Sequence, residues 1–123
     1  ARKIVSWAEK EGIPREDVII DPLAMTVGAD QKAALTTLET IRLIHRELGC
    51  NITLGASNIS FGLPQRESIN DIFVALAISA GVTCPIVNPA KARRAILIAD
   101  LLLGRDEFAM RYIGYCRQQA ANL

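Results

Sequence analysis

Residues 53–64 read TLGASNISFGLP. This stretch leads from the end of a strand-like segment, residues 52–55, into a loop that begins polar and then turns apolar at Ile59, Phe61 and Leu63. Loops that face water are usually short and rich in small polar residues, so large apolar side chains are unexpected here. We therefore expect this loop to hold something flat and partly apolar.

The quoted stretch is the middle of a strand–loop–helix unit that occurs three times along the chain. Alternating strands and helices predict a parallel sheet with right-handed crossovers, which is an α/β fold. A further helix is expected at each end, over 2–11 and about 105–118. The expected strands are residues 17–21, 51–54 and 82–87, and the helices that follow them run from 30 to 48, 69 to 80 and 89 to 103.

Local signals predict where the helices begin and which faces they bury. Asp30 and Ser68 are the expected N-caps of the second and third helices, with Asp71 in the capping-box position after Ser68. Asn88 followed by Pro89 is a cap with proline at the first helical position. The side chains expected to be buried are Ile4, Trp7 and Ala8; Leu35, Leu38, Ile41 and Leu48; and Ile69, Ile72, Phe73 and Leu76.

Two architectures accommodate this order of elements. An open doubly wound sheet needs about five strands to cover both faces, and a complete (β/α)8 barrel needs about 250 residues. A chain of 123 residues with three strands is too short for either. Because the chain also opens inside a helix, without an initiator methionine, we interpret it as part of a barrel.

Composition excludes several classes of function. The formal net charge is +1, without a basic stripe or an acidic tail, so neither nucleic acid nor an anionic membrane is an expected partner. The longest apolar run, residues 95–103, contains Asp100 and is too short to span a membrane, and no signal peptide is visible. These features predict a cytoplasmic protein.

The cysteines and the single histidine do not indicate a metal site. Cys50, Cys84 and Cys116 are far apart in the sequence and form no Cys/His cluster, which argues against zinc and fits reduced thiols. Cys84 lies in an expected strand and is predicted to be buried. His45 lies among charged neighbours on a helix and is predicted to be a surface residue.

The carboxyl ends of the strands are where ligands bind in both architectures. Asp21 follows the first strand; its carboxylate is suited to a pair of N–H donors on a pterin or guanine edge, or else it begins a turn before Pro22. Asn58 follows the second strand and can donate and accept through one amide, or else it is a turn residue.

The neighbouring residues carry weaker signals. Gly55 allows the backbone to approach a flat ring closely, or marks a bulge. Ser57 and Ser60 are either ligand contacts or partners in local loop bonds. Phe61 either walls a site or fills the core beneath the loop. Ile86 lies at the end of the third strand.

Three segments together resemble the pterin-binding methyltransferases, namely the methyltetrahydrofolate:corrinoid methyltransferases and the folate module of cobalamin-dependent methionine synthase. The segments are Asp21-Pro22-Leu23, residues 54–64 and residues 85–89. The loop SNISFGLP is the most specific of them. The resemblance implies a dihydropteroate-synthase-like (β/α)8 TIM barrel, of which residues 1–123 would be the C-terminal three strand–helix units.

The same resemblance implies a reaction and a set of site residues. The N5 methyl group of methyltetrahydrofolate would move to Co(I) of a corrinoid carried by a partner protein or domain. Asn58 matches the residue that bonds to N5 and is the expected catalytic residue. The expected pterin contacts are Asp21, Gly55, Ser57, Phe61 and Ile86.

The resemblance also indicates what this chain lacks. The family takes an Asp and an Asn for the pterin from earlier strands, which have no counterpart here. We therefore expect little activity from the chain alone, and association through its open sheet edges, such as a homo-oligomer. The alternatives are a non-catalytic binding or assembly module, a dihydropteroate-synthase-like enzyme, and another α/β enzyme. A dihydropteroate synthase would carry a Lys and a Ser-x-Arg, and neither lies near Asn58.

Overall fold

Two short parallel strands form the centre of the fold. In the computed structural model, which describes residues 1–121, β1 (Ile19–Ile20) pairs with β2 (Asn51–Ile52). Ile19 lies opposite Asn51, and Ile20 lies opposite Ile52. The amide of Thr53 donates to the carbonyl oxygen of Ile20 at 3.0 Å and extends the pairing beyond the strands. The parallel arrangement predicted from the alternating elements is therefore present.

The third expected strand, residues 82–87, is reduced to an isolated parallel bridge between Gly55 and Ile86. The Ile86 amide donates to Leu54 O at 2.9 Å, so the segment still runs along the free side of β2. Two features explain the shortening. Pro85 has no N–H to donate, and the Thr83 hydroxyl takes the Ile52 amide at 3.0 Å in place of a backbone partner.

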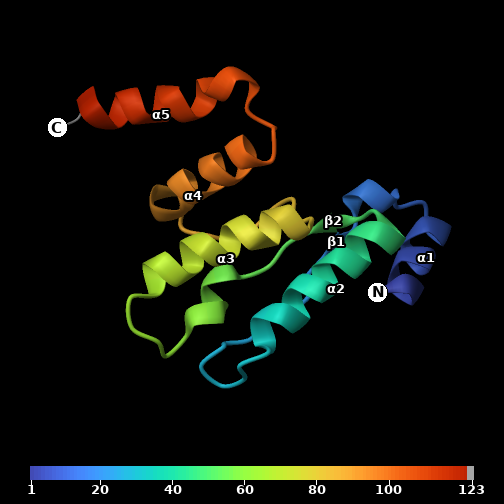
Figure 1. Cartoon of the computed structure of the whole chain (residues 1–123). Coiled ribbons are helices and arrows are strands. Elements are labelled where there is room, and N and C mark those ends of the chain that lie inside the picture. The colour runs from blue at the N-terminus through green and yellow to red at the C-terminus, as the bar shows by residue number, and fades with distance from the viewer. Residues whose placement is uncertain (122–123) are drawn as a thin grey trace.

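The described residues also form five α-helices: α1 (Arg2–Lys10), α2 (Ala33–Leu48), α3 (Arg66–Ala80), α4 (Pro89–Leu102) and α5 (Met110–Ala121). α3 packs between α2 and α4, and α5 contacts α4 (Figure 1). The expected last helix, 105–118, is divided by a 3-10 turn at Glu107–Ala109, where Phe108 and Ala109 have positive φ angles.

The core lies between the sheet and α2, α3 and α4. Ile52 and Leu54, two residues apart on β2 and its extension, are fully buried, as the alternation of a strand requires. They belong to a cluster with Ile41 from α2 and Phe73 and Val74 from α3. Leu38, Ile41 and Phe73 are thus buried as predicted.

Several predicted helix faces are wrong. Ile4, Trp7, Leu35, Ile72 and Leu76 are exposed, with Trp7 at 72%, and α1 instead buries Val5. These side chains point away from the core, and no other element among residues 1–121 covers them. Cys84 is also exposed, contrary to prediction, whereas His45 is on the surface as expected.

Two of the three predicted helix caps are also wrong. The carboxylate of Asp30 accepts the Lys32 amide at 2.9 Å in a turn before α2, and the N-cap itself is Lys32. α3 begins at Arg66, ahead of Ser68, because Gln65 adopts a left-handed conformation with φ 50°. Asn88 does cap α4, accepting the Ala90 amide at 3.0 Å.

No helix in residues 1–121 combines the length and the apolar character needed to cross a bilayer.

Candidate functional site

The pairing of the strands brings the predicted site segments to one edge of the sheet. Asp21 directly follows β1, Gly55 lies three residues after β2, and Ile86 bridges to Gly55. Because the pairings are parallel, the carboxyl ends of all three segments face the same side. Asp21, Asn58 and Ile86 therefore come from neighbouring segments of one sheet edge.

Two hydrogen bonds join the loop after β1 to the loop after β2. The Val27 amide donates to Ile59 O at 2.9 Å, and the Thr26 hydroxyl donates to Phe61 O at 2.7 Å. A Cβ added at Gly28 would lie 3.3 Å from Phe61 O, so the two backbones approach closely there. The two loops therefore form one surface.

The loop after β2 folds into a 3-10 turn, Ala56–Ser60, with an apolar inner side. Ala56, Ile59 and Ser60 are buried, whereas Ser57 and Asn58 are exposed. With about three residues per turn, positions 56 and 59 fall on the same inner face. Ile59 thus anchors the loop in the core, which accounts for part of its apolar character, and the polar pair faces outward.

Asn58 lies at the outer tip of this turn. The backbone N–H of Asn58 donates to Gly55 O at 3.1 Å, and the backbone carbonyl oxygen of Asn58 accepts from the backbone N–H of Phe61 at 3.2 Å. A Cβ on Gly55 would lie 3.2 Å from Asn58 Nδ2. Since φ of Gly55 is −74°, which any residue adopts, the glycine matters here because it leaves room for the side-chain amide of Asn58. The Asn58 side chain forms no hydrogen bond within residues 1–121, which leaves its carboxamide group available to a ligand.

The carboxylate of Asp21 takes part in a turn. Oδ1 accepts the Leu23 amide at 2.8 Å, and Leu23 has a φ of 62°. The turn considered as an alternative to ligand binding is therefore present. Oδ2 forms no hydrogen bond to another part of the described chain. The turn orients the carboxylate, which retains acceptor sites for a ligand because an ionised carboxyl has about four lone-pair positions.

Ser57, Phe61 and Ile86 are all exposed at this edge, Phe61 at 69%. A small cleft of about 130 Å³ lies beside Ser57 between α3 and α4, lined by polar and apolar residues, and Glu67 and Lys91 form an ion pair among them. The candidate site is thus an open edge lined by polar and apolar groups. Within residues 1–121, no cluster of His, Cys, Asp or Glu could hold a metal ion.

Sequence reasoning missed Arg66, the first residue of α3. Its guanidinium donates to Ser57 O at 2.8 Å and to Ser60 Oγ at 3.0 Å, and it lies 5.7 Å from the centre of the Phe61 ring. Ser60 in turn donates to Asn70 Oδ1 at 2.7 Å. An arginine two residues after the SNISFGLP stretch was the available signal, but its partners on the loop are a backbone carbonyl and a hydroxyl.

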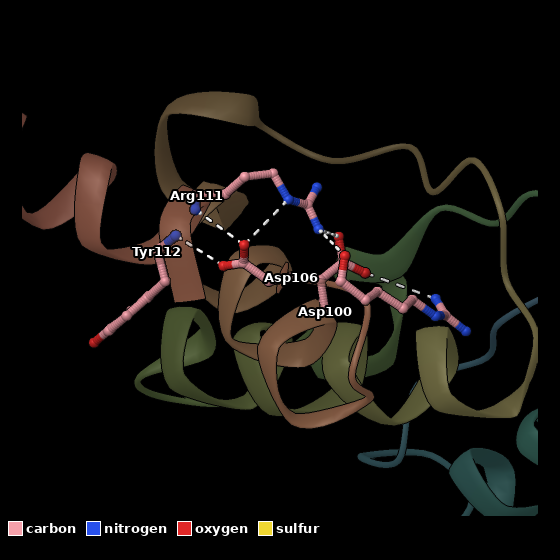
Figure 2. A network of polar contacts seen from close by, with 5 residues as sticks. Asp100, Asp106, Arg111 and Tyr112 are labelled. Carbon is pink, nitrogen blue, oxygen red and sulfur yellow. Dashed lines mark hydrogen bonds and ion pairs between the residues drawn. The ribbon is translucent and has the colours of Figure 1, made fainter. Parts of the chain in front are cut away.

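A second polar cluster closes the corner between α4 and α5 (Figure 2). The Asp106 carboxylate accepts the Arg111 amide at 3.0 Å and the Tyr112 amide at 2.9 Å. These bonds, the Arg111 amide first, hold the pKa of Asp106 below its usual value of 3.8, against the opposing effect of burial. The Arg111 guanidinium also pairs with Asp100 at 2.9 Å. This cluster lies at the corner between α4 and α5, outside the loops that carry the predicted site residues.

Comparison with known proteins places the chain. The family described as "Pterin binding enzyme" matches residues 1–88, a range that includes every predicted site residue. The chain belongs to the pterin-binding enzyme family. This match and the curated relatives of the chain together confirm the resemblance to pterin-binding methyltransferases. Family membership implies a TIM-barrel-like fold, and the mixed helices and strands observed here fit a part of one.

The curated relatives include a methyltransferase and two methionine synthases. A methylcorrinoid:tetrahydrofolate methyltransferase of Eubacterium limosum is 32% identical over 95% of this chain and 44% of its own length. Methionine synthases of Mycobacterium tuberculosis and Mycobacterium leprae are each 34% identical over 65% of this chain and 7% of their own length. The chain thus spans less than half the length of these relatives.

Proposed function

We propose that this chain takes part in methyl transfer between N5 of a tetrahydrofolate and the cobalt of a corrinoid carried by a partner protein or domain. The observation that supports it best is the exposed Asn58 amide, held against Gly55 at the carboxyl edge of a parallel sheet. The names of the relatives from Eubacterium and Mycobacterium support the same chemistry.

The proposal includes the finer fold: residues 1–123 form the last three strand–helix units of a (β/α)8 barrel. The free edge of β1 supports it. A groove of about 610 Å³ runs along that edge between α1 and α2, lined by apolar side chains that include Val5, Ile19 and Leu43. Ile19 is 56% exposed there. A preceding strand of the same barrel would pair with β1 and cover Ile19.

In the proposed reaction Asn58 acts on the leaving nitrogen. The bond between the methyl carbon and N5 breaks as the bond to cobalt forms, and the electron pair of the broken bond stays on N5. Reduced folate leaves poorly unless N5 gains a proton or a hydrogen bond. A neutral carboxamide can donate to N5, or accept from it once it is protonated, without forming a salt bridge that would fix one state.

The other contacts orient the pterin. The Asp21 carboxylate would accept the N–H groups along one edge of the ring, Gly55 and Ser57 would approach its polar rim, and Ile86 would contact its face. Arg66 covers one face of the Phe61 ring, so the pterin would contact Phe61 at its other face or its edge.

The direction of transfer is part of the proposal. We infer that methyltetrahydrofolate is the donor and Co(I) the acceptor. The name of the Eubacterium relative describes transfer from a methylcorrinoid to tetrahydrofolate. Because a catalyst lowers the barrier equally in both directions, Asn58 would have the same role in either case.

Kinetics of the complete polypeptide that carries this chain test the proposal. Replacing Asn58 with Ala should lower kcat for methyl transfer by about 10- to 100-fold, since one hydrogen bond is worth about 1–3 kcal/mol, with little change in folate affinity. Replacing Asp21 with Ala should mainly weaken folate binding. Unchanged kcat in Asn58→Ala together with unchanged affinity in Asp21→Ala would refute the assignment.

A non-catalytic assembly role is the second candidate, and the free edge of β1 is the observation that favours it. We propose that the 123-residue chain alone transfers little methyl and associates through this edge into a homo-oligomer. Gel filtration should then show a species larger than a monomer, and a Lys substitution at Ile19 should shift it towards the monomer. Ready turnover by a stable monomer would contradict both statements.

A further inference from the structure

The turn that presents Asn58 is spanned by the side chain of Arg66. Arg66 binds the carbonyl oxygen of Ser57, immediately before Asn58, and the hydroxyl of Ser60, two residues after it. The Arg66 guanidinium therefore joins the two ends of a short segment with Asn58 between them. We propose that Arg66 is a positioning residue that fixes Asn58 for the methyl transfer proposed above, and this inference rests on that proposed function.

The backbone of the turn needs such a brace. A 3-10 turn has poorer hydrogen-bond geometry than an α-helix, and on this loop it is held mainly by the Asn58 and Phe61 amides. Its inner side is anchored by Ile59, but its outer side is exposed. Donation by a charged group is about twice as strong as donation by a neutral one, so the two bonds from the guanidinium add substantially to the hold on the turn.

Two residues of α3 hold the Ser60 hydroxyl in place. Ser60 is fully buried and donates to Asn70, which lies one turn along α3 from Arg66. The Ser60 hydroxyl thus accepts from Arg66 and donates to Asn70, two residues of the same helix. Gln65 turns the chain through a left-handed conformation immediately before α3, so the helix begins beside the loop. A displacement of the loop would break contacts at both residues of α3.

Arginine suits this role better than lysine. Its planar fork makes two directed bonds while its Cζ atom lies over the Phe61 ring. A lysine could reach one acceptor at a time. Arg66→Lys should therefore restore only part of what Arg66→Gln removes.

Hydrogen exchange in the complete polypeptide tests the brace without any assay of activity. In Arg66→Gln, the amides of Asn58 and Phe61 should exchange about tenfold faster or more, since two charge-assisted bonds are lost at a partly exposed site. The matched control is Arg46→Gln, an exposed arginine of α2 that pairs with Glu47 at 3.4 Å. Unchanged exchange of the two amides in Arg66→Gln would overturn the inference.

A double-mutant cycle tests whether the brace acts through Asn58. Arg66→Gln should lower kcat about tenfold in the wild-type background and less than twofold in the Asn58→Ala background, while the dissociation constant for methyltetrahydrofolate changes less than about threefold. A purely structural arginine would lower kcat equally in both backgrounds, and that result would overturn the inference.

The outcomes separate this inference from the proposed function. If Asn58→Ala slows transfer and Arg66→Gln has no effect, the positioning role fails and the proposed function stands. If Asn58→Ala leaves kcat unchanged, the catalytic role of Asn58 fails and the positioning role fails with it, even where Arg66→Gln speeds amide exchange; the proposed function as a whole fails if Asp21→Ala also leaves folate affinity unchanged.

Discussion

In two regions of this chain an arginine side chain binds a segment of irregular backbone, and the two arginines bind different kinds of acceptor. Arg66 holds the loop after β2 through a carbonyl and a hydroxyl, over a core anchored by Ile59. Arg111 holds the α4–α5 corner through the carboxylates of Asp100 and Asp106. The loop thus combines burial with neutral acceptors, whereas the corner depends on charge. The loop should respond to changes in packing, and the corner to pH and salt.

The largest expected effect comes from removing the apolar anchor of the loop. Ile59→Ala should lower the free energy of unfolding by about 2–5 kcal/mol, because Ile59 is only 1% exposed within the core cluster. Urea denaturation of the chain measures the loss. Phe61→Ala, on the exposed side of the same loop, is the matched control and should cost far less. Equal losses would show that the inner side of the loop does not anchor it.

A smaller effect is expected from the corner. Asp106→Asn should speed amide exchange at Arg111 and Tyr112, because the weaker acceptor replaces a carboxylate that takes both amides. The amides of Asn58 and Phe61 should be unaffected, since the two regions share no contact residue. Site-resolved hydrogen exchange measures both sets. A parallel change in the loop would contradict the independence of the two regions.

The pH dependence of the corner follows from the lowered pKa of Asp106. A carboxyl whose pKa is lower in the folded chain stabilises it fully above the unfolded value, near 3.8, and loses that contribution as the pH falls through the folded pKa. Wild type should thus exceed Asp106→Asn in stability at pH 7, and the difference should shrink below about pH 3.8. Urea denaturation of both proteins at pH 7 and below about pH 3.8 measures this difference in the free energy of unfolding. A difference that does not change with pH would refute the stabilising role of the ionised Asp106 carboxylate.

The smallest effect on stability is expected at Gly55. Gly55→Ala should change the free energy of unfolding by less than about 1 kcal/mol, because its φ of −74° suits alanine. The new methyl group would nevertheless lie 3.2 Å from Asn58 Nδ2 and displace that amide. Methyl transfer by the complete polypeptide should therefore slow while stability is retained. Unchanged transfer would show that the position of the Asn58 amide is unimportant.

The order of the elements could be predicted from the sequence better than the packing of the helices could. Alternating strands and helices were sufficient to predict parallel pairing, and the rule of strand ends was sufficient to place Asp21, Asn58 and Ile86 on neighbouring segments of one sheet edge. Periodicity failed at Trp7 and Leu35, because apolar spacing does not reveal whether another element covers a face. The sequence pattern also predicted a regular strand over residues 82–87, where Pro85 prevents one.

Helix starts and side-chain hydrogen bonds were hardest to predict where they depend on the conformation of the backbone. Ser68 has the sequence signature of an N-cap, but the left-handed Gln65 starts α3 earlier. Arg66 escaped notice because its acceptors are a backbone carbonyl and a serine hydroxyl, neither of which forms a charge pattern in the sequence. The predicted roles of Asp21, Gly55, Ser57, Asn58, Phe61 and Ile86 in binding and catalysis stay predictions.

The most direct measurement is a crystal structure of the complete polypeptide with methyltetrahydrofolate bound. Our account predicts the Asn58 carboxamide at about 3 Å from N5, with the Asp21 carboxylate along the pterin edge and Arg66 still bound to Ser57 O. An Asn58 side chain directed into solvent, with the pterin bound elsewhere, would contradict it.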